Sequence, residues 1–526
     1  MKNLRYIVLL IVGLAIFASC DDFISDNIDP NRPVKASVDL LMPPVLFYSA
    51  LENYDHSEYG MYLSQCLTTG GRSQTGARAY QSGWEFLGMN RHPMWRRHFI
   101  DVGTNVNTIL RYLEEGGNEN YEAVARTMRL LSNQQTTDAF GDMPRSTAYT
   151  EDPEYDTQES IYEWMLEEVD ALLELYDSPE VSQASNVKMD ESIDRIYGGD
   201  MLKWKQFVYG IKARILLRQL PNQNTDAATC QMIIEAAEMA LNGWQDPNYK
   251  FDGGTAVEQN CFWGRTNRAV NSWESRTNNL LGAIPAKYFM ENVLGYDPAT
   301  GEAVDPRLPY LMDARGDEEA GVDTTYRYLE NNIGMPATHQ SAWYPLLYDK
   351  VLTTDTSTIC LLTRGELNFI VAEAAYWAGD KAKAVEQMKE GIRYHMNRMG
   401  VPIEEIEAYL INPNAVPGSA NVTLADVMKQ KYIAMYLQPE QWTDLRRYGY
   451  SNDENGIQYN GEIIYPGLRR PHNLYEAYWS TPNEWIHRLN YDPETEEKYN
   501  RTQLESMGAF QNPEWLKKPM IWGRTN

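Results

Sequence analysis

The strongest constraint on the fold is a pair of amphipathic helices predicted between residues 363 and 399. Apolar residues recur at helical spacing in both halves of this segment. The stripe of the first half is Leu367, Ile370, Val371 and Ala374, and that of the second half is Ala384, Val385, Met388, Ile392 and Met396. Gly379 and Asp380 predict the turn between the helices. Because Ala374 and Ala384 are small, the two helices can approach each other closely.

The same periodicity predicts helices along much of the chain. One begins near residue 121 and ends near Gly141 and Pro144, and further stripes occupy residues 158–176, 201–219, 229–242 and 423–437. The pair at 363–399 resembles a tetratricopeptide-type unit, in which antiparallel helices stack on their neighbours. The sequence therefore predicts an all-α, tetratricopeptide-like scaffold of helical pairs.

Two long stretches interrupt this pattern. Residues 245–362 are rich in Asn, Asp, Gly, Thr and aromatic side chains, and residues 440–526 are irregular as well. Loop-rich stretches of this length in a compact protein are usually functional. We therefore predict a helical scaffold that carries long, irregular, ligand-binding loops.

The N-terminal residues have the pattern of an export signal. Lys2 and Arg5 precede an apolar stretch from Tyr6 to Phe17, which is shorter than the roughly 20 residues that a membrane-spanning helix needs. The following Ala18-Ser19-Cys20 resembles the lipobox of bacterial lipoproteins, in which the cysteine is acylated, and acyl chains anchor a protein to a membrane. A plain signal followed by an accidental cysteine is the alternative.

These residues divide the chain into three parts. Residues 1–19 are the predicted signal peptide, residues 20–43 the lipid anchor with an extended tether, and residues 44–526 a single domain. Asp21 and Asp22 resemble the acidic signal that sends lipoproteins to the cell surface in some gram-negative bacteria. The predicted location is therefore the outer face of an outer membrane.

Composition excludes several functions. The formal net charge is −26, with 73 acidic and 47 basic residues. This balance argues against nucleic acid as a partner and against an anionic membrane surface.

Beyond Cys20, the cysteines Cys66, Cys230, Cys261 and Cys360 are widely spaced, and both disulfides and free buried thiols fit them. The sequence has no nucleophile elbow, zinc-binding HExxH helix or phosphate-binding loop, so we predict no enzyme activity, no metal and no cofactor.

Four stretches together resemble the SusD/RagB family, and more closely its SusD-like branch. They are TTDAFGDMPRSTAY (136–149), RIYGGDMLKWKQFVYGIKARILLR (195–218), the helical pair with Glu366 and Glu373, and QPEQWTDLRRYG (438–449) with its arginine pair. The resemblance implies a right-handed array of helical pairs in a surface lipoprotein. It also implies a SusC-like, TonB-dependent outer-membrane transporter as the partner that receives the captured nutrient.

The residues of these motifs also have a structural interpretation. Gly141 and Pro144 end a helix, and Gly198 and Gly199 allow a tight turn before Asp200 caps the next helix. The remaining motif aromatics at helical spacing are predicted to lie in the core, and they are Trp204, Tyr432 and Trp442.

Aromatic and amide side chains in the loops are the candidate ligand-binding residues. Sugar rings stack their apolar faces on Trp and Tyr, while their hydroxyls need polar partners. The candidates are Tyr80, Gln81 and Trp84, then Trp263, Arg265, Asn267, Trp273 and Arg276, and finally Trp343 and Tyr344. For each tryptophan the alternative is packing within the loops. Arg265 and Arg276 fit either a salt bridge or contact with an anionic or peptidic ligand.

Several functions remain open at this point. The favoured one is capture of oligosaccharides without catalysis. A binder of peptides, or a helical-repeat interaction scaffold that binds no small ligand, would also fit the helices and the anchor. A surface glycosidase needs only two suitably placed carboxylates, but with 73 acidic residues a nearby pair carries no weight.

Overall fold

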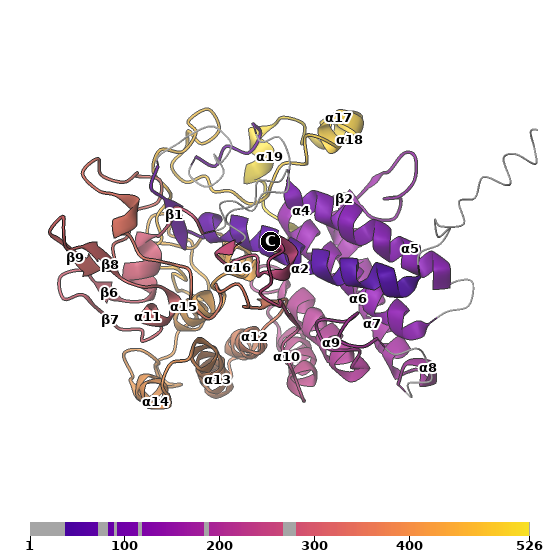
Figure 1. The fold of residues 1–526 in the computed structure, drawn as a ribbon, viewed down its shortest axis with the longest axis horizontal. Coiled ribbons are helices and arrows are strands. Elements are labelled where there is room, and N and C mark those ends of the chain that lie inside the picture. Colours follow the sequence, from indigo (N-terminus) through magenta and orange to yellow (C-terminus); the bar gives the residue numbers. More distant parts are fainter. Residues whose placement is uncertain are drawn as a thin grey trace, which may run out of the picture.

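A computed structural model describes residues 37–71, 83–88, 92–113, 118–182, 189–266 and 280–524. Helices dominate it, and they lie side by side through the right-hand and lower parts of Figure 1. The irregular segments gather at the left and at the top of the same view. This division confirms the predicted fold class, a helical scaffold that carries long loops.

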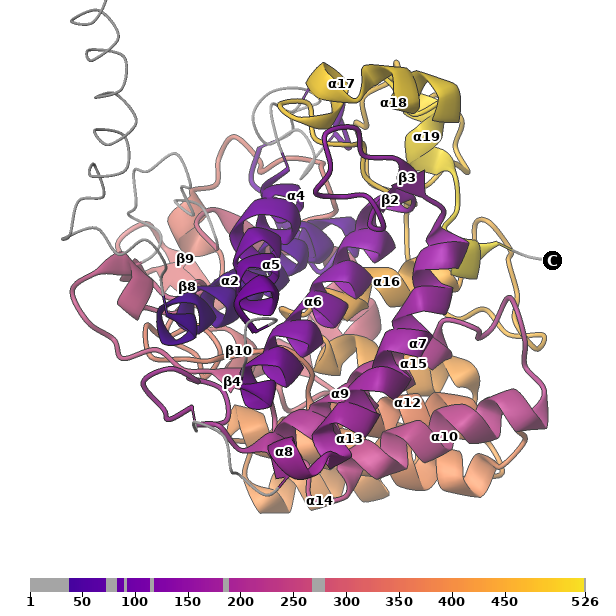
Figure 2. The same cartoon turned by 90° about the vertical axis from the view of Figure 1, so that its right-hand side faces the viewer.

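Six helices form a continuous array in which each packs against the next along the chain (Figure 2). They are α6 (Glu119–Phe140), α7 (Gln158–Asp177), α9 (Met201–Leu217), α10 (Ala227–Leu241), α12 (Arg364–Trp377) and α13 (Lys381–Met399). The apolar residues at helical spacing in α7 are all buried, and they are Ile161, Met165, Val169, Leu172 and Tyr176. Gly141, at φ +88°, ends α6 in a backbone conformation that favours glycine, and the Asp200 side chain accepts from Lys203 N to cap α9.

The pair α12 and α13 has the geometry predicted from its sequence. Gly379, at φ +83°, forms the turn, and the Asp380 side chain accepts a hydrogen bond from Lys383 N at the start of α13. A Cβ on Gly391 would lie 2.7 Å from the Phe369 ring, so a glycine is needed where these helices touch. Burial of both stripes stabilises this antiparallel pair.

The helix α2 (Val38–Leu63) runs through the centre of the molecule and contacts α6 and the helices α4 (Pro93–Arg96) and α5 (Gly103–Leu113). Between α4 and α5 lies the π-helix η1 (Arg97–Val102). The start of α2 corrects the predicted extended tether, since residues 38–43 are helical. Met42, Val45 and Leu46 are all 0% exposed, and their burial outweighs the cost of Pro43 and Pro44 inside a helix.

The remaining helices follow in two groups. α14 (Ile403–Ile411), α15 (Leu424–Ala434) and α16 (Glu440–Arg447) continue the scaffold, with α15 against α12 and α13 and with α16 against α2. The C-terminal helices α17 (Glu496–Tyr499), α18 (Arg501–Met507) and α19 (Pro513–Lys517) lie at the top of Figures 1 and 2, and the turn η6 (Ile521–Gly523) follows them. The short helix α8 (Pro179–Ser182) and the turn η2 (Val257–Gln259) connect longer elements.

The strands are short and pair in antiparallel twos. The pairs are β1 (Leu67–Thr69) with β5 (Ala283–Pro285), β2 (Met143–Pro144) with β3 (Tyr155–Asp156), β4 (Asn248–Tyr249) with β10 (Ile359–Cys360), β6 (Tyr296–Asp297) with β7 (Glu302–Ala303), and β8 (Arg315–Asp317) with β9 (Val322–Thr325). The segment 245–362 also holds the π-helix η4 (Tyr288–Val293), the short α11 (Leu308–Leu311) and the turn η5 (Ser341–Trp343). Most of that segment is irregular, as predicted.

The core explains the aromatic motif residues and the cysteines. Trp204, Tyr432 and Trp442 are at most 4% exposed, which confirms their predicted place in the core. Cys66, Cys230, Cys261 and Cys360 are all buried, and none of them is in a disulfide, so of the two alternatives the structure shows unbridged thiols. Within the described ranges, no helix is both long and apolar enough to cross a lipid bilayer.

Candidate functional site

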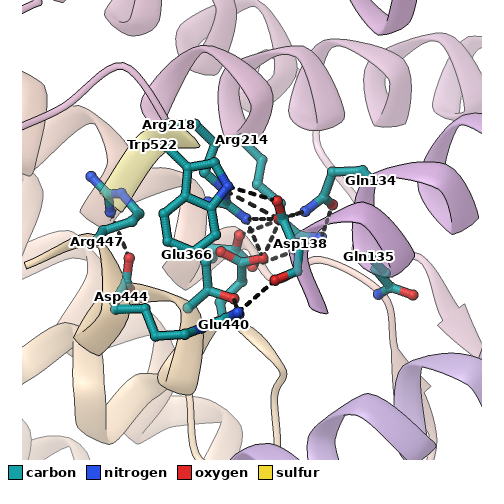
Figure 3. A network of polar contacts seen from close by, with 12 residues as sticks. Gln134, Gln135, Asp138, Arg214, Arg218, Glu366, Glu440, Asp444, Arg447 and Trp522 are labelled. Atoms are coloured by element: carbon teal, nitrogen blue, oxygen red, sulfur yellow. Dashed lines mark hydrogen bonds and ion pairs between the residues drawn. The ribbon is translucent and has the colours of Figure 1, made fainter. Parts of the chain in front are cut away.

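A network of buried charged side chains joins the helices that carry the sequence motifs (Figure 3). Arg214 on α9 contacts Glu366 on α12 through two hydrogen bonds, of 2.7 and 2.8 Å. Arg218 lies between Asp138 of α6, at 2.7 Å, and Glu440 of α16, at 2.8 Å. These four helices are far apart in sequence, and the network fixes where they meet.

A second group of charges extends the network through α15 and α16. Arg447 pairs with Glu373 and, at 2.6 Å, with Asp444, while the Lys431 ammonium lies 3.2 Å from Glu373 and 3.0 Å from Asp444. Burial alone would raise the pKa of Glu373, but Arg447 and Lys431 outweigh it and lower this pKa to about 2. The glutamates and arginines of the motifs therefore hold the scaffold together.

The C-terminal segment closes this network. The Trp522 indole donates a hydrogen bond of 3.0 Å to Asp138, and its ring lies 5.1 Å from the Arg446 guanidinium. Arg446 also stacks at 3.6 Å on the Trp442 ring. Asn222, which follows α9, donates to the Trp522 carbonyl at 3.2 Å. Trp522 is thus buried together with this network.

The candidate ligand-binding surface centres on the β1–β5 strand pair. Thr69 pairs with Ala283, so residues 70–71 lie beside residues 280–282. Residues 70–71 precede the segment with Tyr80 and Gln81. Residues 280–282 follow the segment with Trp273 and Arg276. The Met335 amide donates to the Gly70 carbonyl at 2.7 Å. The fold thus brings the borders of both predicted loop segments to one place, beside the segment that leads to Trp343 and Tyr344.

Trp343 and Tyr344 take different positions on this surface. Trp343 is half-buried, and its indole donates to Asp317 of β8 at 3.2 Å. Tyr344 is only 3% exposed and packs with Ile284 and Leu329, while its hydroxyl lies 3.0 Å from His339 Nδ1. Part of the Trp343 ring is therefore exposed to solvent, whereas Tyr344 is buried beneath the surface.

Trp84 is buried, at 1% exposure. Its ring meets Trp479 at 5.4 Å and Trp485 at 5.8 Å, and its carbonyl accepts from the Trp479 indole at 3.0 Å. This packing leaves no ring face open for a sugar, which argues for the alternative of loop packing. No sequence signal pairs residues 84 and 479, because 395 residues separate them.

Trp263 is buried as well, and Arg265 lies next to it in an ion pair. Trp263 is 3% exposed and packs edge-on against Tyr54 of α2, with ring centroids 4.5 Å apart. The Arg265 guanidinium pairs with Asp349 and lies 5.3 Å from the centroid of the Tyr348 ring. Of the two alternatives predicted for Arg265, the salt bridge is therefore present. Arg265 remains 39% exposed at one edge of the segment that carries Trp343.

The other predicted ligand-binding residues, Tyr80, Gln81, Asn267, Trp273 and Arg276, lie outside the described residues, as does Cys20. For these positions the predictions stay predictions.

Other polar side chains on this surface were not predicted. The backbone carbonyl of Asn332 accepts from Asn473 Nδ2, 2.7 Å away, and the Asn332 side chain donates to the carbonyls of His472 and Asn473. The Tyr475 amide then donates to the Gly83 carbonyl at 2.9 Å. Residues 472–479 thus connect the β1–β5 region with Trp84. In the sequence, the only sign that these residues belong to the surface is that asparagines occur in an irregular segment.

The backbone around this surface is strained. Trp84, Asn332, Asp349 and Asn473 all have positive φ angles, between +49° and +65°. Non-glycine residues adopt this conformation rarely, and such residues cluster at binding sites, where packing holds them in place. This strain is a second reason to place the functional surface here.

Glu52 is a buried carboxyl group whose pKa is strongly raised. Burial raises the pKa of Glu52 to about 8, which would suit a general acid. However, Glu52 is 0% exposed, and it accepts hydrogen bonds from Ser132 at 2.8 Å and from Thr136 at 3.1 Å. Among the described residues, no His, Cys, Asp and Glu side chains gather in a group that could hold a metal ion.

The fold defines a class, that of helical-repeat proteins that carry long irregular loops. The chain belongs to the SusD-like family, since the family model described as "Starch-binding associating with outer membrane" matches residues 30–466. The SusD-like family resemblance found in the sequence is thereby confirmed. Members of this family are carbohydrate-binding proteins associated with the outer membrane.

Solved structures show the same fold. A SusD homolog from Parabacteroides distasonis has 19% identity and a TM-score of 0.68, and the match covers 92% of this chain and 99% of that one. A SusD homolog from Bacteroides uniformis has 18% identity and a TM-score of 0.67, over 93% of this chain and 99% of that one. A chitin-binding protein has 19% identity and a TM-score of 0.63, over 93% and 99%. None of the curated proteins matches the chain.

Proposed function

We propose that this protein is a surface-exposed lipoprotein that captures oligosaccharides, without catalysis, and passes them to a SusC-like, TonB-dependent outer-membrane transporter. The observation that carries the proposal is the meeting of segments at the β1–β5 pair. The borders of two aromatic loop segments and the segment with Trp343 come together there, in a chain of a starch-binding family. Partly exposed rings beside amide side chains suit the stacking and hydrogen bonding of sugars.

The lipid anchor and the transporter rest on separate support. Cys20 in its lipobox-like setting supports the anchor, and the family's association with the outer membrane agrees with it. Passing on a ligand requires only modest affinity, which a few stacking contacts can supply. Arg265 at the edge of the surface extends the proposal to anionic sugars, because its charge remains partly exposed.

The test is calorimetry of the mature, unlipidated protein against a panel of glycans and peptides. Any hit is repeated with Trp343→Ala, and then with Tyr80→Ala and Trp273→Ala. We expect a glycan hit that weakens by about two- to tenfold in one or more of these variants, since stacking on one ring contributes about 0.5–1.5 kcal/mol. Trp84→Ala and Trp263→Ala are poorer probes, because loss of a buried ring also destabilises the fold.

Tyr499→Ala serves as the matched control. Tyr499 is an aromatic residue with 73% exposure on α17, far from the β1–β5 pair, and its loss should leave the affinity unchanged. A peptide hit in place of a glycan hit would make the protein a peptide binder. No hit across the panel would favour the interaction scaffold, and release of new reducing ends from a glycan would contradict the non-catalytic role.

A further inference from the structure

A small cavity lies between α2, α6 and α16, next to the network of Figure 3. It has a volume of about 20 Å³, and the side chains that line it include His56, Gln135, Asp138, Glu440, Trp442 and Arg446. Each of these residues is less than a tenth exposed. A cavity needs roughly 10–15 Å³ to hold one water molecule, so this one has room for a single small occupant.

Three polar atoms of the lining have no hydrogen-bond partner within the described part of the chain. They are His56 Nε2, Gln135 Oε1 and Arg446 Nε. Leaving buried polar atoms unpaired costs free energy, and native proteins rarely do so. Three such atoms around one cavity therefore indicate a polar occupant.

The surrounding contacts decide which of these atoms donate and which accept. The Asn53 amide donates through Nδ2 to the Cys360 carbonyl, so its Oδ1 must accept, and it accepts from Gln135 Nε2 at 2.8 Å. Gln135 Oε1 is therefore left as an acceptor. Arg446 Nε carries a hydrogen and can only donate.

His56 supplies the second acceptor. Burial and the nearby Arg446 lower its pKa to about 3, so the ring is neutral and one of its nitrogens can accept. The set around the cavity is then one donor and two acceptors. A water molecule that accepts one hydrogen bond and donates two matches this set.

We propose that this cavity is a binding site for one structural water molecule, which accepts from Arg446 Nε and donates to Gln135 Oε1 and His56 Nε2. The three hydrogen bonds connect α16, α6 and α2. Arg446 needs such a partner, because its other contacts are the carbonyls of Asp138 and His487, the Thr443 hydroxyl and two indole rings.

An ion fits the cavity less well than water. A cation would lie against the Arg446 guanidinium, and an anion would lie close to the carboxylates of Asp138 and Glu440. A neutral molecule with both donor and acceptor capacity avoids both repulsions.

The test is a high-resolution crystal structure of the protein. We expect one peak of electron density in the cavity, 2.7–3.2 Å from each of the three atoms. An empty cavity would overturn the proposal. So would an anomalous signal at this position in crystals soaked with bromide or rubidium, because it would identify an ion.

A variant pair sharpens the test. Gln135→Met keeps the length of the side chain but removes its acceptor, and we expect the occupancy of the peak to fall below one half. Gln231→Met makes the same change at an exposed position of α10 and should leave the peak unchanged. If Gln135→Met does not fold, His56→Asn provides the same comparison, because the shorter side chain withdraws its acceptor. A peak at full occupancy in the folded variant would overturn the assignment of its partners.

Discussion

Burial keeps several histidine rings of this protein uncharged. Desolvation lowers the pKa of His56, His98 and His487 to about 3 each, with Arg446 and Arg488 adding repulsion at His487. In the unfolded chain a histidine has a pKa near 6.5. As the pH falls below 6.5, the unfolded state therefore binds protons that the folded state does not bind.

Stability should consequently fall on acidification. The contribution of these rings to the free energy of unfolding is complete above about pH 6.5. It is lost as the pH falls towards 3, by up to about 1.4 kcal/mol for each ring and each pH unit. We expect the free energy of unfolding in urea to be lower at pH 5 than at pH 7. Equal stability at both pH values would contradict the burial of neutral rings.

Glu52 should act in the opposite direction. Its folded-state pKa of about 8 lies above the unfolded value near 4.5, so its contribution is complete below pH 4.5 and is lost as the pH rises to 8. Glu52→Gln keeps the acceptor for Ser132 and Thr136 but does not ionise. We expect the variant to gain stability over the wild type by about 1.4 kcal/mol per unit between pH 5 and pH 8. A stability difference that does not change with pH would show that Glu52 is charged in the fold.

At the scale of elements, the C-terminal turn η6 is held in place by hydrogen bonds to the helices α6 and α7. The amide of Ile521 donates to Gln158 of α7 at 3.0 Å, and the Trp522 indole donates to Asp138 of α6. Arg488 holds the same segment by donating to the carbonyls of Lys518 at 2.8 Å and Pro519 at 2.7 Å. The segment thus covers charges that would otherwise meet solvent.

Trp522→Ala should therefore destabilise the protein strongly. The change removes a ring that is 0% exposed and leaves Asp138 without one of its donors, which corresponds to a loss of about 3–5 kcal/mol. Chemical denaturation at pH 7 measures it. Tyr499→Ala, at an exposed position of α17, should change stability by less than about 0.5 kcal/mol. A similarly small effect of Trp522→Ala would mean that the contacts of η6 contribute little to the free energy of unfolding.

At the scale of the whole molecule, the lipid anchor proposed at Cys20 would decide where the protein is located. The Cys20→Ser variant should appear in the soluble fraction of cells that retain the wild type in their membranes, because its acyl chains would be missing. Ser19→Ala keeps a small residue and the thiol, and it should stay in the membrane fraction. Equal membrane retention of Cys20→Ser would mean that another contact holds the protein there.

Much of the scaffold could be predicted from single stretches of sequence. The stripes of α7, α12 and α13, the cap at Asp200 and the turn at Gly379 are local patterns, and helical periodicity is a local property. The first residues of α2 were missed, because Pro43 and Pro44 dominate the local signal while the burial of Met42 and Leu46 is a tertiary effect.

The candidate site was only partly predictable. Which segments carry aromatic and amide side chains is visible in the sequence, and Trp343 and Arg265 lie at the surface as such residues should. Trp84 and Trp263 look the same in sequence, but each is covered by partners more than 200 residues away. Exposure of a side chain depends on the packing of distant segments, which no local pattern encodes.

By itself, the sequence determined the helical class of the fold, the approximate bounds of helices such as α7, α9 and α10, and the resemblance to SusD-like proteins, since all three follow from residue order over short spans. Only the tertiary structure decided which tryptophans remain accessible, that the motif glutamates and arginines meet in one buried network, and that the loop borders meet at the β1–β5 pair. These features join residues as far apart as Asp138 and Trp522. Contacts over such separations form only when the whole chain has buried its core.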